Sequence, residues 1–166
     1  VNTTVKNCTI QNFSEGIRYN SSTGGLMLNN TIITTFSGGN GIRITNNANR
    51  TNVTQNVILN SNGNASGVYI DGGSNVTVDC QQRNVFGGNY SGTYGVYSDE
   101  PNTTVRNCNM TRWDYGIVFD GNNVGLIEYN TINSTSDASN SDPIRVQASA
   151  SNTVVQYNNV STSNTA

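Results

Sequence analysis

The sequence predicts an all-β fold, a parallel β-solenoid of about six to seven coils. Three observations predict it: short alternating segments recur about every 25 residues, Asn or Cys returns at the same place in each repeat, and no long segment has a 3.6-residue period. A repeat of this length, built from short strands and turns, is typical of a solenoid whose coils pair about 4.8 Å apart. Equivalent residues are therefore expected to stack in columns along one axis.

The first repeated element is a short strand that ends on an apolar residue. Its copies are VKNCTI (5–10), MLNNTI (27–32), VTQNVI (53–58), QQRNVF (81–86), VRNCNM (105–110), IEYNTI (127–132) and VQYNNV (155–160). Two residues before the end of every copy stands an Asn or a Cys: Cys8, Asn30, Asn56, Asn84, Cys108, Asn130 and Asn158. Asn tolerates the left-handed backbone conformation at sharp bends, and stacked amides bond to one another along a column. We therefore predict a structural Asn ladder at this position.

A second element lies between these copies and has the two-residue period of a strand. It reads GIRY (16–19), GIRI (41–44), GVYI (67–70), GVYS (95–98), GIVF (116–119) and PIRV (143–146). Successive side chains of a strand point to opposite faces, so Ile17 and Tyr19 are expected inside and Arg18 outside. Connections of varying length between the two elements place the insertions at one corner of the solenoid. An antiparallel sandwich also has short strands, but it does not explain why one residue type recurs at one place.

The patterns VxNCTIxNxxxGI and LNNTIxxxxxxxGIxI resemble the repeats of right-handed, single-stranded parallel β-helices of the pectate-lyase-like superfamily. The resemblance includes its NosD-like and carbohydrate-binding branch and many surface proteins. It covers nearly the whole chain and implies a right-handed β-helix. It does not select a function, because that superfamily includes lyases, hydrolases, adhesins and purely structural shafts.

Composition limits the organisation and the partners of the chain. Of 166 residues, 34% are hydrophobic and 11% charged, and the net charge is −2. We expect a single β-helical domain over residues 1–166 with a thin apolar core. No cluster of Lys or Arg provides the positive surface of a nucleic-acid-binding protein, and no apolar run approaches the ~18 residues that span a bilayer. Neither nucleic acid as a partner nor a membrane span is expected.

Three carboxylates are predicted to stand on successive coils. Asp71, Asp99 and Asp120 each follow a copy of the second element and point outward by strand parity. Carboxylates ~5 Å apart repel unless a cation or a shared proton relieves them, so a Ca²⁺ site, the one cofactor suggested, is one interpretation. Tyr69 and Tyr97, two residues earlier, offer aromatic faces to a sugar. The alternatives are glycosidase-type acid–base chemistry and a structural role in solvated turns, where Asp bonds to nearby backbone.

Aromatic and basic side chains add further candidates for ligand binding. The segment TRWDYG places Trp113 and Tyr115 in a short loop, where they form a sugar platform, contact a partner or pack the corner. Arg18, Arg43 and Arg145 occupy the outward position of the second element. They either contact an anionic polymer or remain solvated on the surface.

No catalytic residue can be assigned from the sequence. The chain has no histidine, whereas polygalacturonase-like members of the superfamily combine one with their aspartates. No Arg or Lys falls in a recognisable lyase motif. The resemblance therefore carries no active-site residue over to this chain, and a protein without enzymatic activity is favoured over an enzyme.

Cysteines and glycosylation motifs bear on the compartment. The three cysteines, an odd number, are interpreted as structural thiols, because Cys8 and Cys108 lie four coils apart and stacked side chains on adjacent coils point poorly for a bond between Cys80 and Cys108. The motif Asn-x-Ser/Thr is frequent, which suits an exported glycoprotein. Candidates for glycosylation are Asn2, Asn12, Asn20, Asn49, Asn64, Asn89 and Asn133, and the motif also occurs at Asn7, Asn29, Asn52, Asn75, Asn102, Asn109 and Asn159.

Both ends of the repeat array are predicted to be open. Neither VNTTVKNCTI at the start nor NTVVQYNNV with its polar tail is typical of a cap. Uncapped coils expose apolar core and unpaired strand edges, so end-to-end self-association or continuation in a longer solenoid is expected. The expected function is that of an extracellular or cell-surface structural protein, a fibre or filament subunit or a stalk segment. A carbohydrate-binding module is the alternative, and a polysaccharide lyase or hydrolase is a second alternative.

Overall fold

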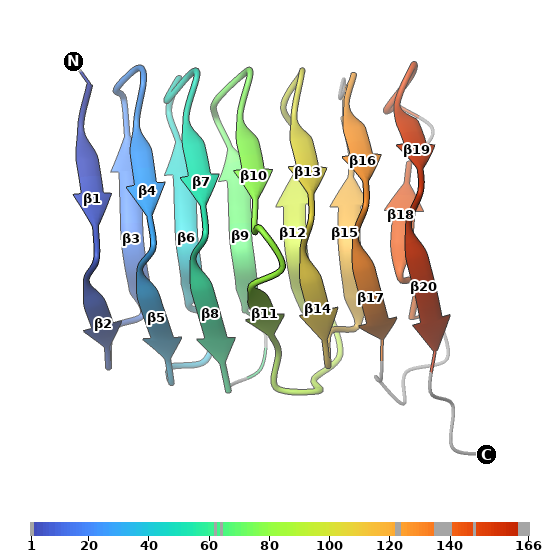
Figure 1. Cartoon of the computed structure of the whole chain (residues 1–166), viewed down its shortest axis with the longest axis horizontal. Coiled ribbons are helices and arrows are strands. Elements are labelled where there is room, and N and C mark those ends of the chain that lie inside the picture. The colour runs from blue at the N-terminus through green and yellow to red at the C-terminus, as the bar shows by residue number, and fades with distance from the viewer. Residues whose placement is uncertain are drawn as a thin grey trace.

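The chain winds into a solenoid whose coils lie side by side, with the first and the last described strands at opposite ends of the long axis (Figure 1). The computed structural model describes residues 2–61, 63, 65–121, 124–134, 141–147 and 149–162. Every strand pairing recorded among them is parallel, and no helix long and apolar enough to cross a bilayer occurs in that part of the chain. The predicted all-β parallel solenoid is confirmed.

Three parallel sheets run along the axis. Among the described residues, six coils add one strand to each sheet in order, and a seventh coil adds strands to two of the sheets. Sheet A contains β1 (Thr4–Lys6), β4 (Leu26–Leu28), β7 (Asn52–Thr54), β10 (Thr77–Asp79), β13 (Thr104–Arg106), β16 (Leu126–Glu128) and β19 (Val154–Gln156). Sheet B contains β2 (Thr9–Gln11), β5 (Thr31–Thr34), β8 (Val57–Asn60), β11 (Asn84–Phe86), β14 (Asn109–Thr111), β17 (Thr131–Ser134) and β20 (Asn159–Thr162). Sheet C contains β3 (Glu15–Asn20), β6 (Asn40–Thr45), β9 (Ser66–Asp71), β12 (Tyr94–Ser98), β15 (Tyr115–Phe119) and β18 (Ile144–Val146). Coils 1 to 6 are the successive strand triplets from β1–β3 to β16–β18, and coil 7 consists of β19 and β20.

The core is a narrow column between the three sheets. In sheet C the inward residues alternate with outward ones as the two-residue period predicts, so Val68 and Ile70 are fully buried while Tyr69 between them is not. Each inward residue contacts its counterpart one coil away, because the strands pair in register. Burial of such apolar side chains contributes roughly 25 cal/mol per Å² and is the main stabilising term. The core members with no exposed surface include Ile32, Ile42, Ile44, Val68, Ile70, Val96, Val105, Met110, Ile117, Phe119 and Ile127.

The predicted ladder is present as two runs of Cys, Asn and Asn. In the first run, Oδ1 of Asn30 accepts the backbone N–H of Cys8 at 3.0 Å. The backbone N–H and Nδ2 of Asn30 both donate to Oδ1 of Asn56, at 3.0 and 2.9 Å. Asn130 makes the same three hydrogen bonds with Cys108 and Asn158. A buried amide at this position therefore links three consecutive coils.

The bend from sheet A to sheet B is made by the residue before the ladder, and not by the ladder residue itself. That preceding residue has a left-handed backbone in six coils: Asn7 (φ 56), Asn29 (φ 52), Gln55 (φ 57), Asn107 (φ 54), Tyr129 (φ 55) and Tyr157 (φ 54). The left-handed role predicted for the ladder Asn is wrong by one residue. Because of this bend, the side chain of the next residue points inward. Its amide group then forms hydrogen bonds with the neighbouring coils along the axis.

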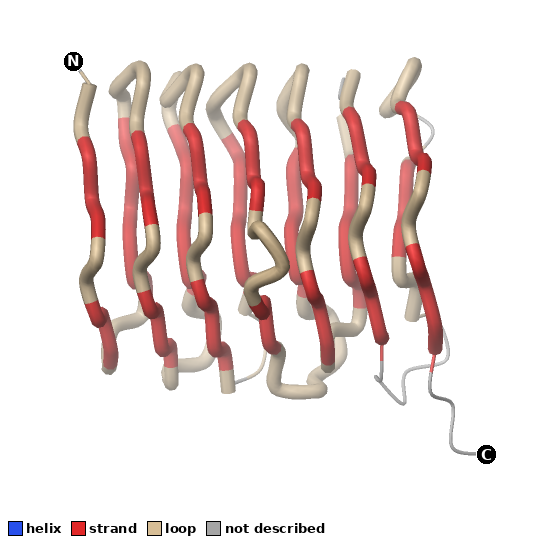
Figure 2. Tube along the Cα trace, in the orientation of Figure 1, coloured by secondary structure: helices blue, strands red, loops and turns tan. Residues whose placement is uncertain are grey.

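Coil 4 departs from the other coils between β10 and β11, where the chain makes a wider loop (Figure 2). Asp79 pairs with Arg106 and Asn84 pairs with Asn109. Between these two pairs the chain advances by five residues in coil 4 but by only three residues in coil 5. The two extra residues belong to a bulge around Gln81 and Gln82, both with positive φ.

This bulge overturns the prediction that Asn84 belongs to the ladder. Val85 pairs with Met110 and is buried, whereas Phe86 pairs with Thr111 and is only half-buried. The alignment on Phe86 was therefore one residue out of register. Asn84 is exposed, and its Oδ1 accepts a hydrogen bond from Nδ2 of Asn109 at 2.8 Å.

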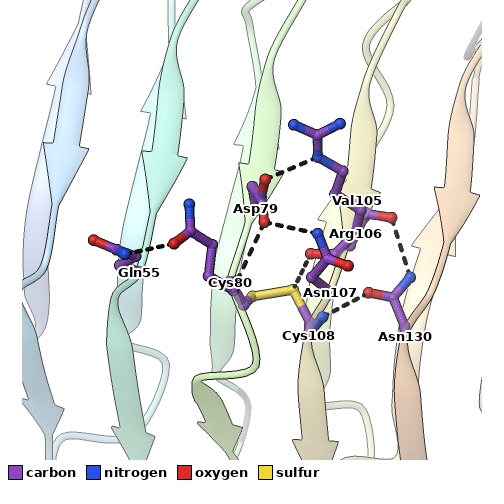
Figure 3. Close-up of polar contacts among 9 residues, drawn as sticks. Gln55, Asp79, Cys80, Val105, Arg106, Asn107, Cys108 and Asn130 are labelled. Carbon is purple, nitrogen blue, oxygen red and sulfur yellow. Dashed lines mark hydrogen bonds and ion pairs between the residues drawn. A yellow bond between two sulfur atoms is a disulfide. The ribbon is translucent and has the colours of Figure 1, made fainter.

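Cys80 and Cys108 form a disulfide between coils 4 and 5, with Cα atoms 4.7 Å apart (Figure 3). The prediction that these two cysteines are free thiols is wrong. Since Asp79 pairs with Arg106, Cys80 lies opposite Asn107 and one position out of register with Cys108. The two side chains therefore approach diagonally and are not stacked in parallel. Cys8 is a free thiol, as predicted, and its side chain is exposed, which the sequence did not predict.

Candidate functional site

The outward face of sheet C gathers most of the side chains that the sequence singled out. One column crosses all six strands and contains Arg18, Arg43, Tyr69, Tyr97, Val118 and Arg145. The next column contains Asn20, Thr45 and Asp71 and continues to Asp99 and Asp120, because Ile70, Ser98 and Phe119 before them are paired. Strand parity predicted both columns correctly.

Four tyrosines form a continuous cluster on this face. The rings of Tyr69 and Tyr97 are stacked, with centroids 4.7 Å apart and planes 11° apart. Tyr94 lies 5.3 Å from Tyr97 and is stacked 5.5 Å from Tyr115. The sequence singled out three of these residues and missed Tyr94, which β12 brings opposite Tyr115 at the start of the strand. An alignment of GVYS (95–98) with GIVF (116–119) already places Tyr94 opposite Tyr115, and this register would have identified it.

Arginines cover the two ends of the tyrosine cluster. The guanidinium of Arg43 lies 5.8 Å from the ring centroid of Tyr69, and that of Arg145 lies 5.4 Å from the centroid of Tyr115. Since Tyr69 lies between Arg43 and Tyr97 in the column, both faces of its ring are in contact with protein. Tyr69 therefore does not present an open face on which a sugar ring stacks.

Arg43 is also held by two carboxylates. Its Nη2 lies 2.6 Å from Oδ2 of Asp71, and its Nη1 lies 3.2 Å from Oε1 of Glu15. The hydrogen bond to Asp71 is the largest influence that raises the pKa of the Arg43 guanidinium. Arg43 thus bridges coils 1, 2 and 3, and it is not the freely solvated residue that was one of the two sequence interpretations.

The three aspartates lie on successive coils, but they do not form a metal site. Asp71 is paired with Arg43, and Oδ1 of Asp120 accepts hydrogen bonds from the Gly121 N–H at 2.7 Å and the Ser149 hydroxyl at 3.3 Å. No group of three His, Cys, Asp or Glu side chains in the described part of the chain has a metal-binding arrangement. The interpretation of these residues as a calcium site is therefore not supported. The contacts of Asp120 are those of an aspartate in a turn.

Asp99, between them, is the least satisfied of the three carboxylates. Its Oδ1 is buried and has no hydrogen-bond partner among the described residues. Burial raises the pKa of Asp99 above its ordinary value, and the charges of Asp71 and Asp120 add to this, while a hydrogen bond from its own backbone N–H opposes it. The pKa of Tyr97 is raised by burial first and then by Asp99.

Trp113 is a core residue and not an exposed platform. It is 1% exposed, and its indole N–H donates to the carbonyl of Val85 at 2.8 Å. The ring lies against Gly87 and Gly95 of coil 4, where the absence of a side chain leaves room for it. Its assignment as a ligand-binding residue is wrong, because the short loop turns it back under the preceding coil.

The described residues enclose no pocket. The tyrosine and aspartate columns therefore provide hydroxyl groups and carboxylates along an open strip. Such a strip offers hydrogen bonds to an extended ligand.

The glycosylation candidates differ in accessibility. Half-buried candidates are Asn49, Asn89 and Asn133, and the exposed ones are Asn2, Asn12 and Asn20. The amide oxygen of Asn49 accepts hydrogen bonds from the N–H and hydroxyl of Ser74, at 2.8 and 3.0 Å. Asn64 lies outside the described residues. The three exposed candidates are the most accessible of these sites to a modifying enzyme.

The parallel sheets, the Asn ladder and the register define a β-helix repeat protein. The model of one family, the right-handed β-helix region, matches the chain in two overlapping segments, residues 1–80 and 40–166. The chain therefore belongs to the right-handed β-helix family. No curated protein matches it, and no solved structure does. The family fixes the fold and assigns no ligand, and the resemblance to a particular branch of the pectate-lyase-like superfamily stays a prediction.

Proposed function

We propose that this chain is a structural segment of an extracellular fibre or stalk, in which further β-helical coils pack against its end faces. The observation that carries the proposal is the apolar end face of coil 7. Val155 and Val160 occupy inward positions and are 47% and 48% exposed, whereas Ile127 and Ile132 at the same positions of coil 6 are 0% and 1% exposed. Exposed core positions beside an unpaired strand edge favour addition of another coil.

Two features support an extracellular location. The disulfide between Cys80 and Cys108 favours an oxidising compartment, because cytosolic thiols are generally kept reduced. Exposed glycosylation motifs at Asn2, Asn12 and Asn20 suit the same compartment. A disulfide across two coils also resists separation of the coils under tension, which is a useful property in a stalk that is pulled along its axis.

The proposal is tested by the assembly of the purified chain. Sedimentation velocity over a range of concentrations and negative-stain microscopy are expected to show association through the coil 7 face. The double substitution Val155→Lys and Val160→Lys should abolish it, because two charges then occupy the apolar face. Phe36→Lys is the matched control, since Phe36 is 51% exposed in coil 2, away from that face. The proposal is contradicted if the parent chain is monomeric at all concentrations, or if Phe36→Lys reduces association as much as the double substitution does.

Carbohydrate binding on sheet C is a second candidate, favoured by one observation. Four half-buried tyrosines lie side by side on an open strip, next to the half-buried side chain of Asp99. Affinity electrophoresis in gels containing neutral or acidic polysaccharides should then show retardation that Tyr97→Ala removes. Tyr129→Ala is the control, because Tyr129 is exposed on a different face. Equal mobility of the parent chain with and without polysaccharide contradicts this candidate.

A further inference from the structure

Coils 5 and 6 repeat coils 1 and 2 at a distance of 100 residues. Residues 2–34 and 102–134 are identical at 13 of 33 positions, beginning with NTTVKNC and NTTVRNC. The equivalent strands occupy the same places in sheets A and B. Coil 4 precedes the second copy, whereas the first copy begins at the N-terminal end of the described solenoid (Figure 1). Because coils 1 and 5 share these residues, the contacts of coil 5 with coil 4 indicate which kind of coil the residues of coil 1 would fit.

Three consecutive residues of coil 5 hold Asp79, the last residue of β10, and Cys80, which follows it (Figure 3). Nε of Arg106 donates to Oδ2 of Asp79 at 2.9 Å, and Nδ2 of Asn107 donates to Oδ1 of Asp79 at 3.1 Å. Cys108 forms the disulfide with Cys80. The guanidinium of Arg106 and the amide of Asn107 thus bind the carboxylate of Asp79, and Cys108 is joined covalently to Cys80 on the preceding coil.

A fourth residue of coil 5 reaches the same coil from the other side of the solenoid. Trp113 donates to the carbonyl of Val85 and lies against Gly87 and Gly95, all in coil 4. Its side chain is buried because coil 4 covers it. The contact between the coils therefore has a polar, covalent part at sheet A and an apolar part at the corner after sheet B.

Coil 1 carries a counterpart of each of these four residues, and all four are exposed. Lys6, Asn7, Cys8 and Phe13 stand 100 positions before Arg106, Asn107, Cys108 and Trp113. Phe13 is 59% exposed, against 1% for Trp113. In the described residues, β1, β2 and β3 pair with strands on one side only. Asn7 accepts a hydrogen bond from Asn29 through Oδ1, which leaves its Nδ2 directed to no described partner.

The thiol of Cys8 is already oriented like the bonded sulfur of Cys108. The backbone N–H of Cys8 donates to Asn30 Oδ1 at 3.0 Å, and that of Cys108 donates to Asn130 Oδ1 at 3.0 Å. Each Sγ lies 3.3 Å from the carbonyl oxygen two residues earlier, on Lys6 and on Arg106. The free cysteine therefore needs no rearrangement to meet a partner placed as Cys80 is.

We propose that the face formed by Lys6, Asn7, Cys8 and Phe13 binds a β-helical coil of the coil 4 type and is joined to it by a disulfide at Cys8. In the partner coil the sheet A strand ends in Asp and is followed by Cys, and glycine stands where Phe13 packs. This inference rests on the proposed stalk function and specifies the partner of one end face. The last coil of the chain does not meet these requirements, because Gln156 and Tyr157 stand where coil 4 has Asp79 and Cys80.

The bond forms by two exchange steps with a low-molecular-weight disulfide such as glutathione disulfide. The Cys8 thiolate attacks that disulfide and releases one thiol, and the partner cysteine then attacks the mixed disulfide and releases the second thiol. The two protein thiols are oxidised and the small disulfide is reduced, with one proton leaving each protein thiol.

The test places a coil of the required type in front of the full chain. Residues 76–101 are added directly ahead of Asn2, which recreates the order found at Asn102 and introduces a fourth cysteine. The chains are refolded with glutathione disulfide and then treated briefly with reduced glutathione, which removes glutathione from an unpaired cysteine. The unextended chain is expected to keep one alkylatable thiol and the extended chain none. Peptide mapping without reductant should join Cys8 to the added copy of Cys80, and the thermal midpoint should rise.

Matched variants separate docking from folding. In the extended chain, Cys8→Ser should leave one free thiol on the added coil, and Asp→Ala at the added copy of Asp79 should slow formation of the bond. The intact Cys80–Cys108 bond reports that the native coils are folded. A folded extended chain in which Cys8 remains alkylatable overturns the proposal. This result is distinguishable from failure of the stalk function, which is measured at the opposite face through Val155 and Val160.

Discussion

Gly67 and Gly95 lie in adjacent coils so closely that a Cβ atom on Gly67 would come within 2.5 Å of the carbonyl oxygen of Gly95. The same relationship runs along the start of sheet C, where Gly41 lies over the carbonyl of Gly67 and Gly95 lies over that of Gly116. The glycines that open the second repeated element are therefore required by contact between coils. None of these four has a positive φ, so backbone conformation is not the reason for them.

Gly67→Ala is accordingly expected to destabilise the protein by more than about 2 kcal/mol, because the added methyl group meets backbone and the packed side chain of Val85. Urea denaturation followed by circular dichroism measures the change. Gly63→Ala is the control, since its added methyl group would lie 3.4 Å from the Tyr90 ring in ordinary contact. A change of less than about 0.5 kcal/mol at Gly67, comparable to that at a tolerant site, contradicts this account.

Loss of the bond between Cys80 and Cys108 is expected to lower the free energy of unfolding by about 2–4 kcal/mol, because the bond closes a loop across two coils. The double variant Cys80→Ser and Cys108→Ser should show this loss with and without reductant. Reductant should lower the stability of the parent chain to the same level. Cys8→Ser serves as the control and should be neutral, since Cys8 is exposed and forms no disulfide.

Asn130→Ala tests the ladder. The amide of Asn130 accepts from the N–H of Cys108 and donates to the carbonyl of Val105, and its truncation removes both hydrogen bonds and leaves the buried N–H of Cys108 without this partner. A buried group left unpaired costs about 1–3 kcal/mol and a lost hydrogen bond about 0.5–1.5 kcal/mol, so we expect a total loss of about 1.5–4.5 kcal/mol. Asn84→Ala, at the exposed position that the sequence alignment mistook for a ladder residue, should cost less than about 0.5 kcal/mol. Equal effects at the two positions would remove the distinction between ladder and surface Asn.

The repeat pattern was enough to predict the columns of the solenoid. Because coils stack in register, Asn30 and Asn56 had to be neighbours once the spacing was recognised, and the same holds for Tyr69 and Tyr97. The prediction failed at coil 4, since a bulge shifts the register without changing the residue type at the expected place. The alignment therefore accepted Asn84 and missed the approach of Cys80 to Cys108.

The direction of side chains in short corner loops was also beyond the sequence pattern. Trp113 and Tyr115 are two residues apart, yet one is buried and the other half-buried. The burial of Trp113 depends on Gly87 and Gly95 in the preceding coil, residues that leave a space for it. A single repeat does not contain that information, because the space belongs to its neighbour.

Trp113→Ala is expected to destabilise the protein by about 3–5 kcal/mol, since it empties a large volume of the core and removes the hydrogen bond to Val85. Phe13→Ala is its counterpart in coil 1 and should change stability by less than about 0.5 kcal/mol in the chain alone, because Phe13 is 59% exposed. Thermal denaturation of the two variants decides between these roles. A Trp113 variant of normal stability that lost polysaccharide binding would restore the exposed-platform interpretation.

Asp99→Asn should increase stability at pH 7, in contrast to most substitutions of partly buried residues. The pKa of Asp99 is raised in the folded protein, mainly by burial and then by the charges of Asp71 and Asp120. The folded protein therefore binds a proton where the unfolded chain has already lost it, so the free energy of unfolding falls as pH rises through the carboxyl range. Removing the charge should therefore raise the free energy of unfolding at pH 7. The gain should be less than about 1 kcal/mol, because solvent screens the partly exposed group.

The gain from Asp99→Asn should disappear near pH ~3, where the carboxyl group is protonated in the folded protein and largely so in the unfolded chain. Thermal midpoints of the parent chain and the variant between pH 3 and pH 8 measure it. Asp71→Asn, in the same column, should act in the opposite direction at pH 7, because it breaks the ion pair with Arg43 and leaves that guanidinium with Glu15 alone. If both substitutions lower the thermal midpoint at pH 7, the carboxylate of Asp99 is satisfied in solution, and the uncompensated charge on sheet C does not exist.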